Sequence, residues 1–430
     1  AAQHLVTLKP IAVELVDDTM LGLAAEIPMF HATLEAMLNG KPRAILLVEF
    51  DSGEDENRRR MAALSQMMGD LGLDFRNGGA KWGGVVEVYD PALQNAITEL
   101  RKSGLNIMMS MKDQRKPISF VEDCAVPLPK LAEYTARLTE CFERHGTRGT
   151  WYAHASEGCL HVRPVLNLRL EKDVKAMRAI AEEAFALVRH YKGSHSGEHG
   201  DGLVRSEFHQ EMFGSELVRA FEEVKDSFDP RGMMNPGKIV RAPKFDERGL
   251  FRYAPGYAVK DFTPALDWSD YPGAVGGLQG AAEQCNNNGA CRKAEGGAMC
   301  PSYRVTRDEQ HVTRGRANTL RLALSGQLGE GAFTSDEMAE TMHLCVSCKA
   351  CKRECPTGVD MARMKIEVLA ARAKERGYGL RDRLIAGMPH YAPLAARFAP
   401  LLNLRNKIGV LRWFSEKLLG FAASRDLPVW

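Results

Sequence analysis

Seven of the ten cysteines in this 430-residue sequence lie between residues 285 and 355. The second part of this stretch reads Cys-x2-Cys-x2-Cys-x3-Cys-Pro, with thiols at Cys345, Cys348, Cys351 and Cys355. In a run of this kind the first three thiolates bind one iron–sulfur cluster and the fourth reaches a different cluster. The first part carries Cys285, Cys291 and Cys300, and it ends in the same Cys-Pro pair. The spacing therefore predicts two iron–sulfur clusters that exchange one ligand each.

Seven thiols are one fewer than two four-cysteine clusters require, because Asn288 stands where a middle cysteine would be expected. With the exchanged ligand, a complete 4Fe-4S cluster would be held by Cys300, Cys345, Cys348 and Cys351. The remaining site, Cys285, Cys291 and Cys355, would hold either a 3Fe-4S cluster or a 4Fe-4S cluster with a non-cysteine ligand. Zinc is the alternative interpretation, but zinc sites use two separate pairs rather than three cysteines followed by Cys-Pro.

Composition excludes several classes of protein. A chain with 45% hydrophobic and 26% charged residues can fill at least two cores, which excludes intrinsic disorder. The net charge of +2 gives no indication of a nucleic-acid partner. No apolar run approaches the roughly 18 residues of a membrane-spanning helix, and the first residues, AAQHLVTLKP, do not form an export signal. Because clustered thiols must stay reduced during assembly, we expect the cytoplasm or the cytoplasmic face of a membrane.

The chain divides into four parts by pattern. Residues 1–241 mix strand-like runs with helical patterns, which predicts an α+β domain. Residues 242–280 are rich in Gly, Pro and aromatics and predict an extended linker, whereas 281–370 predict a small all-α metal domain. Residues 371–430 hold eleven Lys and Arg against four Asp and Glu, which predicts a basic amphipathic helical tail. The strand-like runs are Ala44–Phe50, Gly84–Val88, Ile118–Val121, Thr150–His154 and Leu160–Leu168.

Two histidines flank a turn signal in TWYAHASEGCLHVRPVLNL. The pair Glu157-Gly158 suits a two-residue hairpin loop, because glycine accepts the positive φ that such turns require. A loop of these two residues would set His154 opposite His161, with Cβ atoms roughly 5 Å apart on one face. Two imidazoles at that separation can chelate one divalent ion. Ordinary packing of both histidines is the alternative interpretation.

A glycine-rich decapeptide, GSHSGEHGDG, occupies residues 193–202. Glycines let a loop bring its backbone close to a ligand. The carboxylate of Glu198 could complete a His-His-Glu metal site, and the imidazole of His199 could accept a proton. The alternative is a flexible turn in which His195 and His199 face solvent.

In chain order, HASEGCLHVRP, SGEHGDG and FDPRGMMNPGK resemble the C-terminal cap of FAD-linked oxidases of the vanillyl-alcohol oxidase/p-cresol methylhydroxylase superfamily. D-lactate and D-2-hydroxyglutarate dehydrogenases are among its members. The cysteine-rich region is similar to the iron–sulfur part of large fused dehydrogenases. The resemblance implies a ferredoxin-like α+β cap with an antiparallel sheet, followed by a small all-α iron–sulfur domain. It also implies that FAD is bound mainly by an N-terminal lobe that is not visible in this sequence.

The resemblance implies roles for individual residues. His154, His161 and Glu198 would bind a divalent metal, which could be zinc, manganese or iron. His199 would be the base next to the flavin.

Two further roles follow from the same resemblance. Asn235 of NPGK would approach the flavin, and Arg115 would bind the substrate carboxylate. One position departs from the pattern: the 2-hydroxyglutarate enzymes show a lysine where Val121 stands here. The identity of the hydroxy acid therefore stays open.

These expectations combine into a function. We expect part of a dehydrogenase that oxidises a D-2-hydroxy acid resembling D-lactate and passes electrons through both clusters to a quinone, a cytochrome or a downstream domain. The sequence is expected to be a segment of a longer protein, inactive without its FAD-binding lobe or subunit. The alternatives are a non-catalytic electron-transfer module that docks a separate flavoprotein, and a zinc-stabilised interaction protein. The basic tail is expected to pack on another domain, with peripheral contact to anionic lipid as its alternative.

Overall fold

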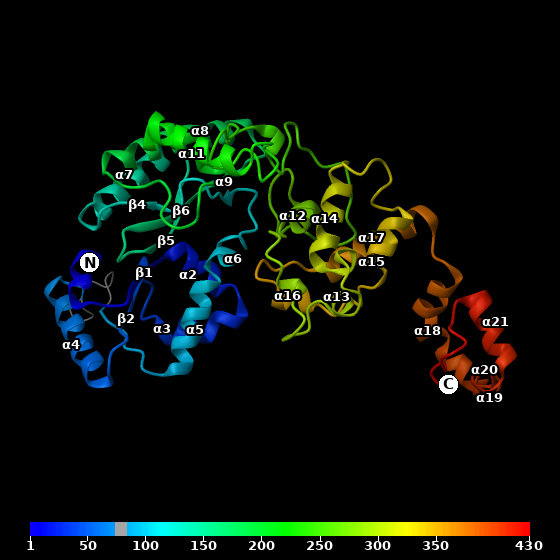
Figure 1. The fold of residues 1–430 in the computed structure, drawn as a ribbon. Coiled ribbons are helices and arrows are strands. Elements are labelled where there is room, and N and C mark those ends of the chain that lie inside the picture. Colours follow the sequence, from blue (N-terminus) through cyan, green and yellow to red (C-terminus); the bar gives the residue numbers. More distant parts are fainter. Residues whose placement is uncertain (74–83) are drawn as a thin grey trace.

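The computed structural model describes residues 1–73 and 84–430 of the chain. Figure 1 shows an α+β domain, a helical domain beside it, and a small group of helices at the C-terminal end. The predicted fold class, an α+β cap with an antiparallel sheet followed by an all-α domain, is confirmed.

In the described part of the chain, six strands form one antiparallel sheet in the order β2-β1-β5-β6-β3, with β4 also paired to β6. Their bounds are β1 Ala12–Asp17, β2 Ala44–Glu49, β3 Lys116–Pro117, β4 Cys124–Ala125, β5 Gly149–His154 and β6 Cys159–Leu166. The run Gly84–Val88 is described but forms no strand, so that prediction is wrong. Its Val85 packs beside α4 (Glu54–Asp70) without a partner strand. The run Ile118–Val121 lies beyond the end of β3 and is also not a strand, so this prediction is wrong as well. Its Phe120 and Val121 are buried in the core.

The hairpin of β5 and β6 forms with a register two residues from the predicted one. His161 pairs with Tyr152, and His154 pairs with Cys159. The loop is longer than predicted because the chain after β5 continues along β1: the backbone N–H of Ala155 donates to the carbonyl of Val13 over 2.7 Å. A shift of two residues keeps every side chain on its predicted face. The two histidines therefore remain on one face as diagonal neighbours, with ring centroids 4.9 Å apart.

Glycine at position 158 is required by the turn. Its φ is +70°, and a Cβ there would lie 2.1 Å from the carbonyl oxygen of Val126. The turn is thus pressed against the segment that follows β4, which brings the hairpin end close to Asp123.

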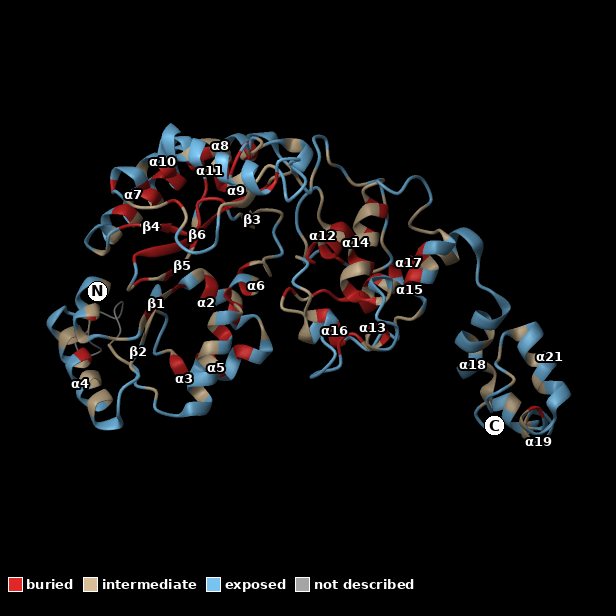
Figure 2. Cartoon of the chain, viewed as in Figure 1, coloured by how far each residue is buried: buried red, intermediate tan, exposed pale blue. Residues whose placement is uncertain are grey.

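Helices cover both faces of the sheet. α7 (Leu131–Arg144) and α8 (Glu171–His190) pack on the face that carries Ala153 and Leu160. The other face of β1 and β2 is covered by α2 (Asp18–Ala25), α3 (His31–Met37) and α5 (Pro91–Lys102). Figure 2 shows the buried residues concentrated along β5, β6 and the inner sides of these helices. Because directly opposed residues share a face, Tyr152, His154 and His161 point away from α7 and α8.

The helical domain contains the cysteine loops. Its helices are α12 Gly277–Glu283, α13 Pro301–Thr306, α14 Thr313–Leu324, α15 Asp336–His343, α16 Ala350–Glu354 and α17 Met361–Arg376. The predicted linker contributes to this core, because Trp268 is buried and its indole N–H donates to Glu367 over 2.7 Å. The second half of the linker is therefore packed rather than free.

Polar contacts join the two domains. Arg169, which follows β6, forms an ion pair with Glu283 at the end of α12. The amide of Gln284 donates to the backbone carbonyl of Ser110 over 2.6 Å and accepts from Lys116 Nζ at 3.1 Å. The thiol-bearing loops are thus held against the cap by groups directly before Cys285.

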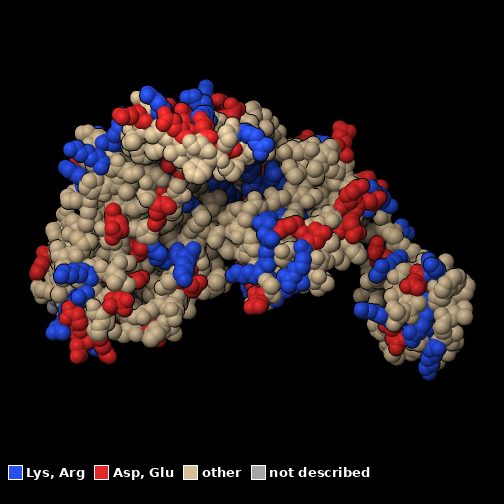
Figure 3. Space-filling view, viewed as in Figure 1, with Lys and Arg blue, Asp and Glu red and all other residues tan. Residues whose placement is uncertain are grey.

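The tail consists of α18 (Leu380–Arg397), α19 (Ala399–Leu402), α20 (Leu404–Lys407) and α21 (Gly409–Leu419). It lies apart from the domains in Figure 1, and α18 and α21 bury no residue. Within the described residues, no helix combines the length and apolar character needed to cross a bilayer. Figure 3 shows basic side chains on the tail and around α16, where Lys349 and Arg353 are exposed.

Candidate active site

Three imidazoles meet one carboxylate oxygen at the end of the β5–β6 hairpin. Oε1 of Glu198 lies 2.9 Å from Nε2 of His154, 3.2 Å from Nε2 of His161 and 3.3 Å from Nε2 of His199. The first two histidines come from the hairpin, and the other two residues come from the glycine-rich loop. The structure therefore brings together all four residues that the sequence placed in this site.

His154 is oriented by a carboxylate that the sequence analysis did not identify. Its Nδ1 lies 2.8 Å from Oε1 of Glu14, and Arg101 of α5 lies 2.6 Å from the same oxygen. Nδ1 also lies 3.0 Å from Nη2 of Arg101, and Nε2 faces the carboxylate of Glu198. With the ring hydrogen on Nδ1 and donated to Glu14, the lone pair on Nε2 would be free for a metal ion, which is the arrangement of a metal-binding histidine supported by a carboxylate.

The imidazole of His161 is buried and has a lowered pKa, which suits a neutral metal ligand. The residue is 1% exposed, and burial lowers the pKa of its imidazole to about 4, with smaller contributions from His154 and His199. Its Nδ1 has no hydrogen-bond partner among the described residues. An imidazole that is neutral at physiological pH and aimed at a carboxylate fits a divalent metal.

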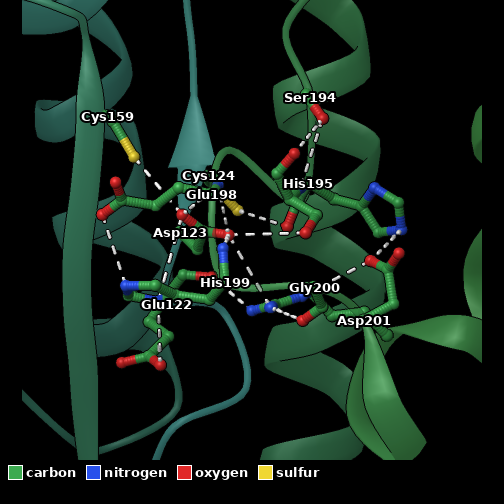
Figure 4. Close-up of polar contacts among 12 residues, drawn as sticks. Glu122, Asp123, Cys124, Cys159, Ser194, His195, Glu198, His199, Gly200 and Asp201 are labelled. Carbon is green, nitrogen blue, oxygen red and sulfur yellow. Dashed lines mark hydrogen bonds and ion pairs between the residues drawn. The ribbon is translucent and has the colours of Figure 1, made fainter.

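Asp123 holds the glycine-rich loop in place, as Figure 4 shows. Its carboxylate accepts from the backbone N–H of Glu198 at 2.9 Å and of His199 at 2.8 Å. Burial raises the pKa of this carboxyl, but the two N–H groups outweigh burial and bring the pKa below its ordinary value. Glycine is needed at position 197, because a Cβ there would lie 2.9 Å from Sγ of Cys159. The signal in the sequence was the acidic pair Glu122-Asp123 directly after an apolar run.

His199 is the most accessible imidazole of the group. Its side chain is 37% exposed and stacks on His161 with centroids 4.6 Å apart. Its Nδ1 lies 3.5 Å from Oε1 of Glu122. One atom each from Asp123, His161, Glu198 and His199 falls within 4.8 Å of the others, so His199 is itself a possible ligand, and it faces the same oxygen of Glu198 as His154.

The thiols form two groups with the predicted exchange. Cys300 lines one cavity together with Cys345, Cys348 and Cys351, which come from the second half of the stretch. In the other group, the Cys355 thiolate helps to raise the pKa of Cys285 and Cys291, although burial is the largest cause at both residues. The two groups of thiols fit two iron–sulfur clusters that exchange one cysteine ligand each.

Arg316 contacts a thiol of the first group, Cys300. Its guanidinium is fully buried and lies 3.8 Å from Sγ of Cys300. Burial raises the pKa of Cys300, but the hydroxyls of Ser302 and Thr313 together with Arg316 outweigh burial and lower it. Burial raises the pKa of Cys351, in the same group, and of Cys291, in the other group, to about 11, so the lowering is local to Cys300.

Comparison with known proteins identifies the family. A family model described as "FAD linked oxidases, C-terminal domain" matches residues 1–239. The chain belongs to this family of FAD linked oxidases. A second model, "4Fe-4S dicluster domain", matches residues 281–359. The chain is therefore a FAD linked oxidase cap joined to an iron–sulfur dicluster domain.

The curated relatives that align with this chain along its whole length are named as dehydrogenases. The D-2-hydroxyglutarate dehydrogenases of Escherichia coli (strain K12) and Pseudomonas putida are each 30% identical to it, over 468 and 469 residues. Each alignment covers 100% of this chain and 44% of the relative, so the chain spans less than half of their length. The D-lactate dehydrogenase of Archaeoglobus fulgidus is 35% identical over 127 residues, which are 30% of this chain and 28% of that protein.

Two residues assigned by resemblance lie away from the histidine site. Arg115 donates to the carbonyl of Gly146 at 3.2 Å. The next residue, Lys116, pairs with Leu166, which is about 17 Å along β6 from His161 at 3.4 Å per residue. Asn235 is exposed, in a loop after α11 (Ser215–Phe228), with a φ of 49°. No hydrogen bond between described side chains joins either residue to the histidine site.

Proposed function

We propose that this chain forms the cap and the electron exit of a dehydrogenase that oxidises a D-2-hydroxy acid with FAD. The observation that supports this most is the convergence of His154, His161 and His199 on one oxygen of Glu198, in a cap packed against two groups of cluster-binding thiols. The FAD-binding part would be supplied by an N-terminal lobe or subunit, as the family description implies.

His154, His161 and Glu198 would hold a divalent ion. Nε2 of His154 and Nε2 of His161 lie 2.9 Å and 3.2 Å from Oε1 of Glu198, and two imidazoles with one carboxylate suit zinc, manganese or iron. When bound, the ion would supply positive charge for the carboxylate and hydroxyl of the substrate, and FAD would supply the hydride acceptor. We prefer His154 to His199 as the ligand because Glu14 fixes its ring, whereas His199 is the more accessible of the two.

His199 would take the proton of the substrate hydroxyl. Its ring lies between the carboxylates of Glu122 and Glu198, at 3.5 Å and 3.3 Å. Two negative neighbours stabilise the imidazolium that forms when the proton arrives. Asp123 fixes the backbone of His199 and thereby the position of the base.

The substrate class is a D-2-hydroxy acid, and D-2-hydroxyglutarate is its first candidate because relatives with that name align along the whole chain. D-lactate is the second candidate. Val121, at the position of the lysine in the 2-hydroxyglutarate enzymes, is 0% exposed and packs in the core. It therefore offers no cation to a second carboxylate, and this is the reason to keep D-lactate, a smaller acid, as the second candidate.

The electrons would leave through the iron–sulfur domain. Cys300 with Cys345, Cys348 and Cys351 would hold a 4Fe-4S cluster, and Cys285, Cys291 and Cys355 would hold the second cluster. The acceptor would be a quinone, a cytochrome or another domain. Because all ten cysteines are free thiols, we propose that assembly takes place in a reducing compartment.

Replacing the base tests the proposal. His199→Ala, in a chain that includes its FAD-binding lobe, should lower turnover of D-2-hydroxyglutarate or D-lactate about 100- to 10,000-fold. The matched control is His190→Ala, because His190 is an exposed histidine at the end of α8. Iron and sulfide content should not change in either variant. Equal turnover in the His199 variant and the control would refute the proposed base, and absence of turnover on any 2-hydroxy acid in the unaltered protein would refute the substrate class.

A further inference from the structure

His195, Asp201 and His209 form a second group of possible metal ligands beside the glycine-rich loop. One ligand atom from each residue lies within 4.8 Å of the others. Nε2 of His195 is 3.7 Å from Oδ1 of Asp201, and Nε2 of His209 is 3.1 Å from Oδ2 of the same carboxylate. Figure 4 shows the His195 ring turned toward Asp201 and away from Glu198. The group is therefore separate from the histidine site described above.

Four polar atoms in this group are buried without a hydrogen-bond partner among the described residues. They are Nδ1 and Nε2 of His195, Nε2 of His209 and Oδ1 of Asp201. The carbonyl of Ile239 lies 2.9 Å from Nδ1 of His209 and can only accept, so the ring hydrogen of a neutral His209 belongs on Nδ1. Its Nε2 then directs a lone pair at the carboxylate of Asp201. Unpaired buried groups of this kind are costly, and a cation among them would satisfy all three residues.

Aromatic rings enclose the group. The His195 ring lies 5.4 Å from Phe185 and 5.6 Å from Phe213, and the His209 ring lies 5.3 Å from Phe213, measured between centroids. His195 and His209 are 0% and 3% exposed. Water therefore has little access to the unpaired atoms.

The nearby charges leave a net negative balance. Nε of Arg205 lies 3.6 Å from Oδ1 of Asp201, but the same guanidinium lies 3.7 Å from Asp123. Its Nη1 donates to the carbonyl of Glu122 over 2.8 Å, and its Nη2 donates to the carbonyl of Gly200 in the loop. One arginine thus faces two carboxylates.

We propose that His195, Asp201 and His209 bind a second divalent metal ion, of the zinc type, with a structural role. Two imidazoles and a carboxylate favour a transition ion over magnesium or calcium, which prefer oxygen ligands. Each oxygen of Asp201 faces one of the two histidines, and Oδ1 also faces Nε of Arg205 at 3.6 Å.

The proposed ion would fix the loop that carries Glu198 and His199. His195 and Asp201 lie on either side of these residues, and His209 begins α10 (His209–Phe213). The decapeptide contains four glycines and is costly to order. An ion bound to His195, Asp201 and His209 would stabilise the observed conformation of the loop. This site does not depend on the proposed oxidation reaction.

Zinc counting on the cluster-loaded chain tests the proposal. Cluster loading keeps the cysteines from binding zinc, and zinc is measured by mass spectrometry beside iron and sulfide. Glu198→Ala, which removes a ligand of the first site, should leave one equivalent of zinc. Adding His195→Gln and His209→Gln to Glu198→Ala should remove that equivalent, whereas adding His190→Gln should not. Zinc X-ray absorption of the Glu198→Ala chain should show nitrogen and oxygen neighbours without sulfur.

A second readout covers variants that fold poorly. Zinc should raise the thermal unfolding midpoint of the Glu198→Ala chain, and this rise should disappear in the triple variant. The proposal is overturned if Glu198→Ala already removes all zinc, or if the His195 and His209 substitutions leave the zinc content unchanged. It is also overturned if NMR shows a protonated His209 paired with Asp201 in the zinc-treated protein.

Discussion

The backbone N–H of His199 donates to the buried carboxylate of Asp123 over 2.8 Å. The N–H of Glu198 donates to the same carboxylate, so one side chain fixes both functional residues of the loop. Asp123 itself has a φ of 71°, a conformation that Asp and Asn tolerate better than most residues. The position of the candidate base therefore depends on a residue from a different segment of the chain.

Asp123→Asn should weaken this arrangement without changing its shape. Asparagine tolerates the same φ, but its amide group would face backbone donors that need an acceptor. We expect a loss of about 1–3 kcal/mol in the free energy of unfolding and at least a tenfold loss of turnover. Asp261→Asn, at an exposed loop residue, is the control. Denaturant unfolding beside turnover checks the prediction, and equal stability of the two variants would contradict it.

Glu14→Gln should weaken metal binding at the histidine site. Glu14 accepts from Nδ1 of His154 at 2.8 Å, and a glutamine amide can present a donor there instead. Loss of such a supporting carboxylate lowers metal affinity about 10- to 100-fold. Competition with a fluorescent zinc chelator measures this change. The exposed Glu99→Gln on α5 should retain full affinity, and a Glu14 variant with the same affinity would show that the carboxylate does not support the ligand.

The β5–β6 hairpin shows how far the sequence could predict the site. Residue alternation placed His154 and His161 on one face, and this holds because the register differs from the predicted one by two residues, whereas a shift of one residue would have put them on opposite faces. The register itself was wrong by two residues, since β1 pairs with the chain beyond His154 and lengthens the loop. That pairing involves Val13, far away in sequence, and no local pattern reports it.

In the rest of the molecule, too, local spacing could be read from the sequence, whereas contacts between distant segments could not. The cysteine spacing was informative because cluster geometry constrains it directly, and the structure brings Cys300 to the thiols of Cys345, Cys348 and Cys351. Glu14 and Arg101 could not be found in advance, because their contacts to His154 are made only after β1 and α5 pack together.

Lys116 should make stability depend on pH in the alkaline range. Burial, followed by Arg169, lowers its pKa from 10.5 to about 8 at the contact between the domains. Below pH 8 both the folded and the unfolded chain hold this proton, so the cost of the buried charge is present in full. Between pH 8 and 10.5 only the unfolded chain keeps the proton, so stability should rise with pH, by up to about 3 kcal/mol. Denaturant unfolding of the wild type against Lys116→Gln checks this, and parallel pH profiles would contradict it.

Arg316 should raise the reduction potential of the cluster bound by Cys300, Cys345, Cys348 and Cys351. Its buried guanidinium donates toward Sγ of Cys300 over 3.8 Å, and positive charge favours the more negative, reduced cluster. Arg316→Met should lower this potential by about 60 mV, which corresponds to about 1.4 kcal/mol for one electron, a typical value for a hydrogen bond to a charged group. The potential of the other cluster should stay unchanged.

Two further variants separate charge from packing. Arg316→Lys keeps the charge and should recover most of the potential if the variant folds. Arg353→Met removes an arginine whose side chain is 82% exposed and should shift neither cluster. Redox titration followed by electron paramagnetic resonance measures both potentials in one sample. Equal potentials in the wild type and Arg316→Met would show that the guanidinium only stabilises the fold, through its bonds to Ser302 and the carbonyl of Thr341.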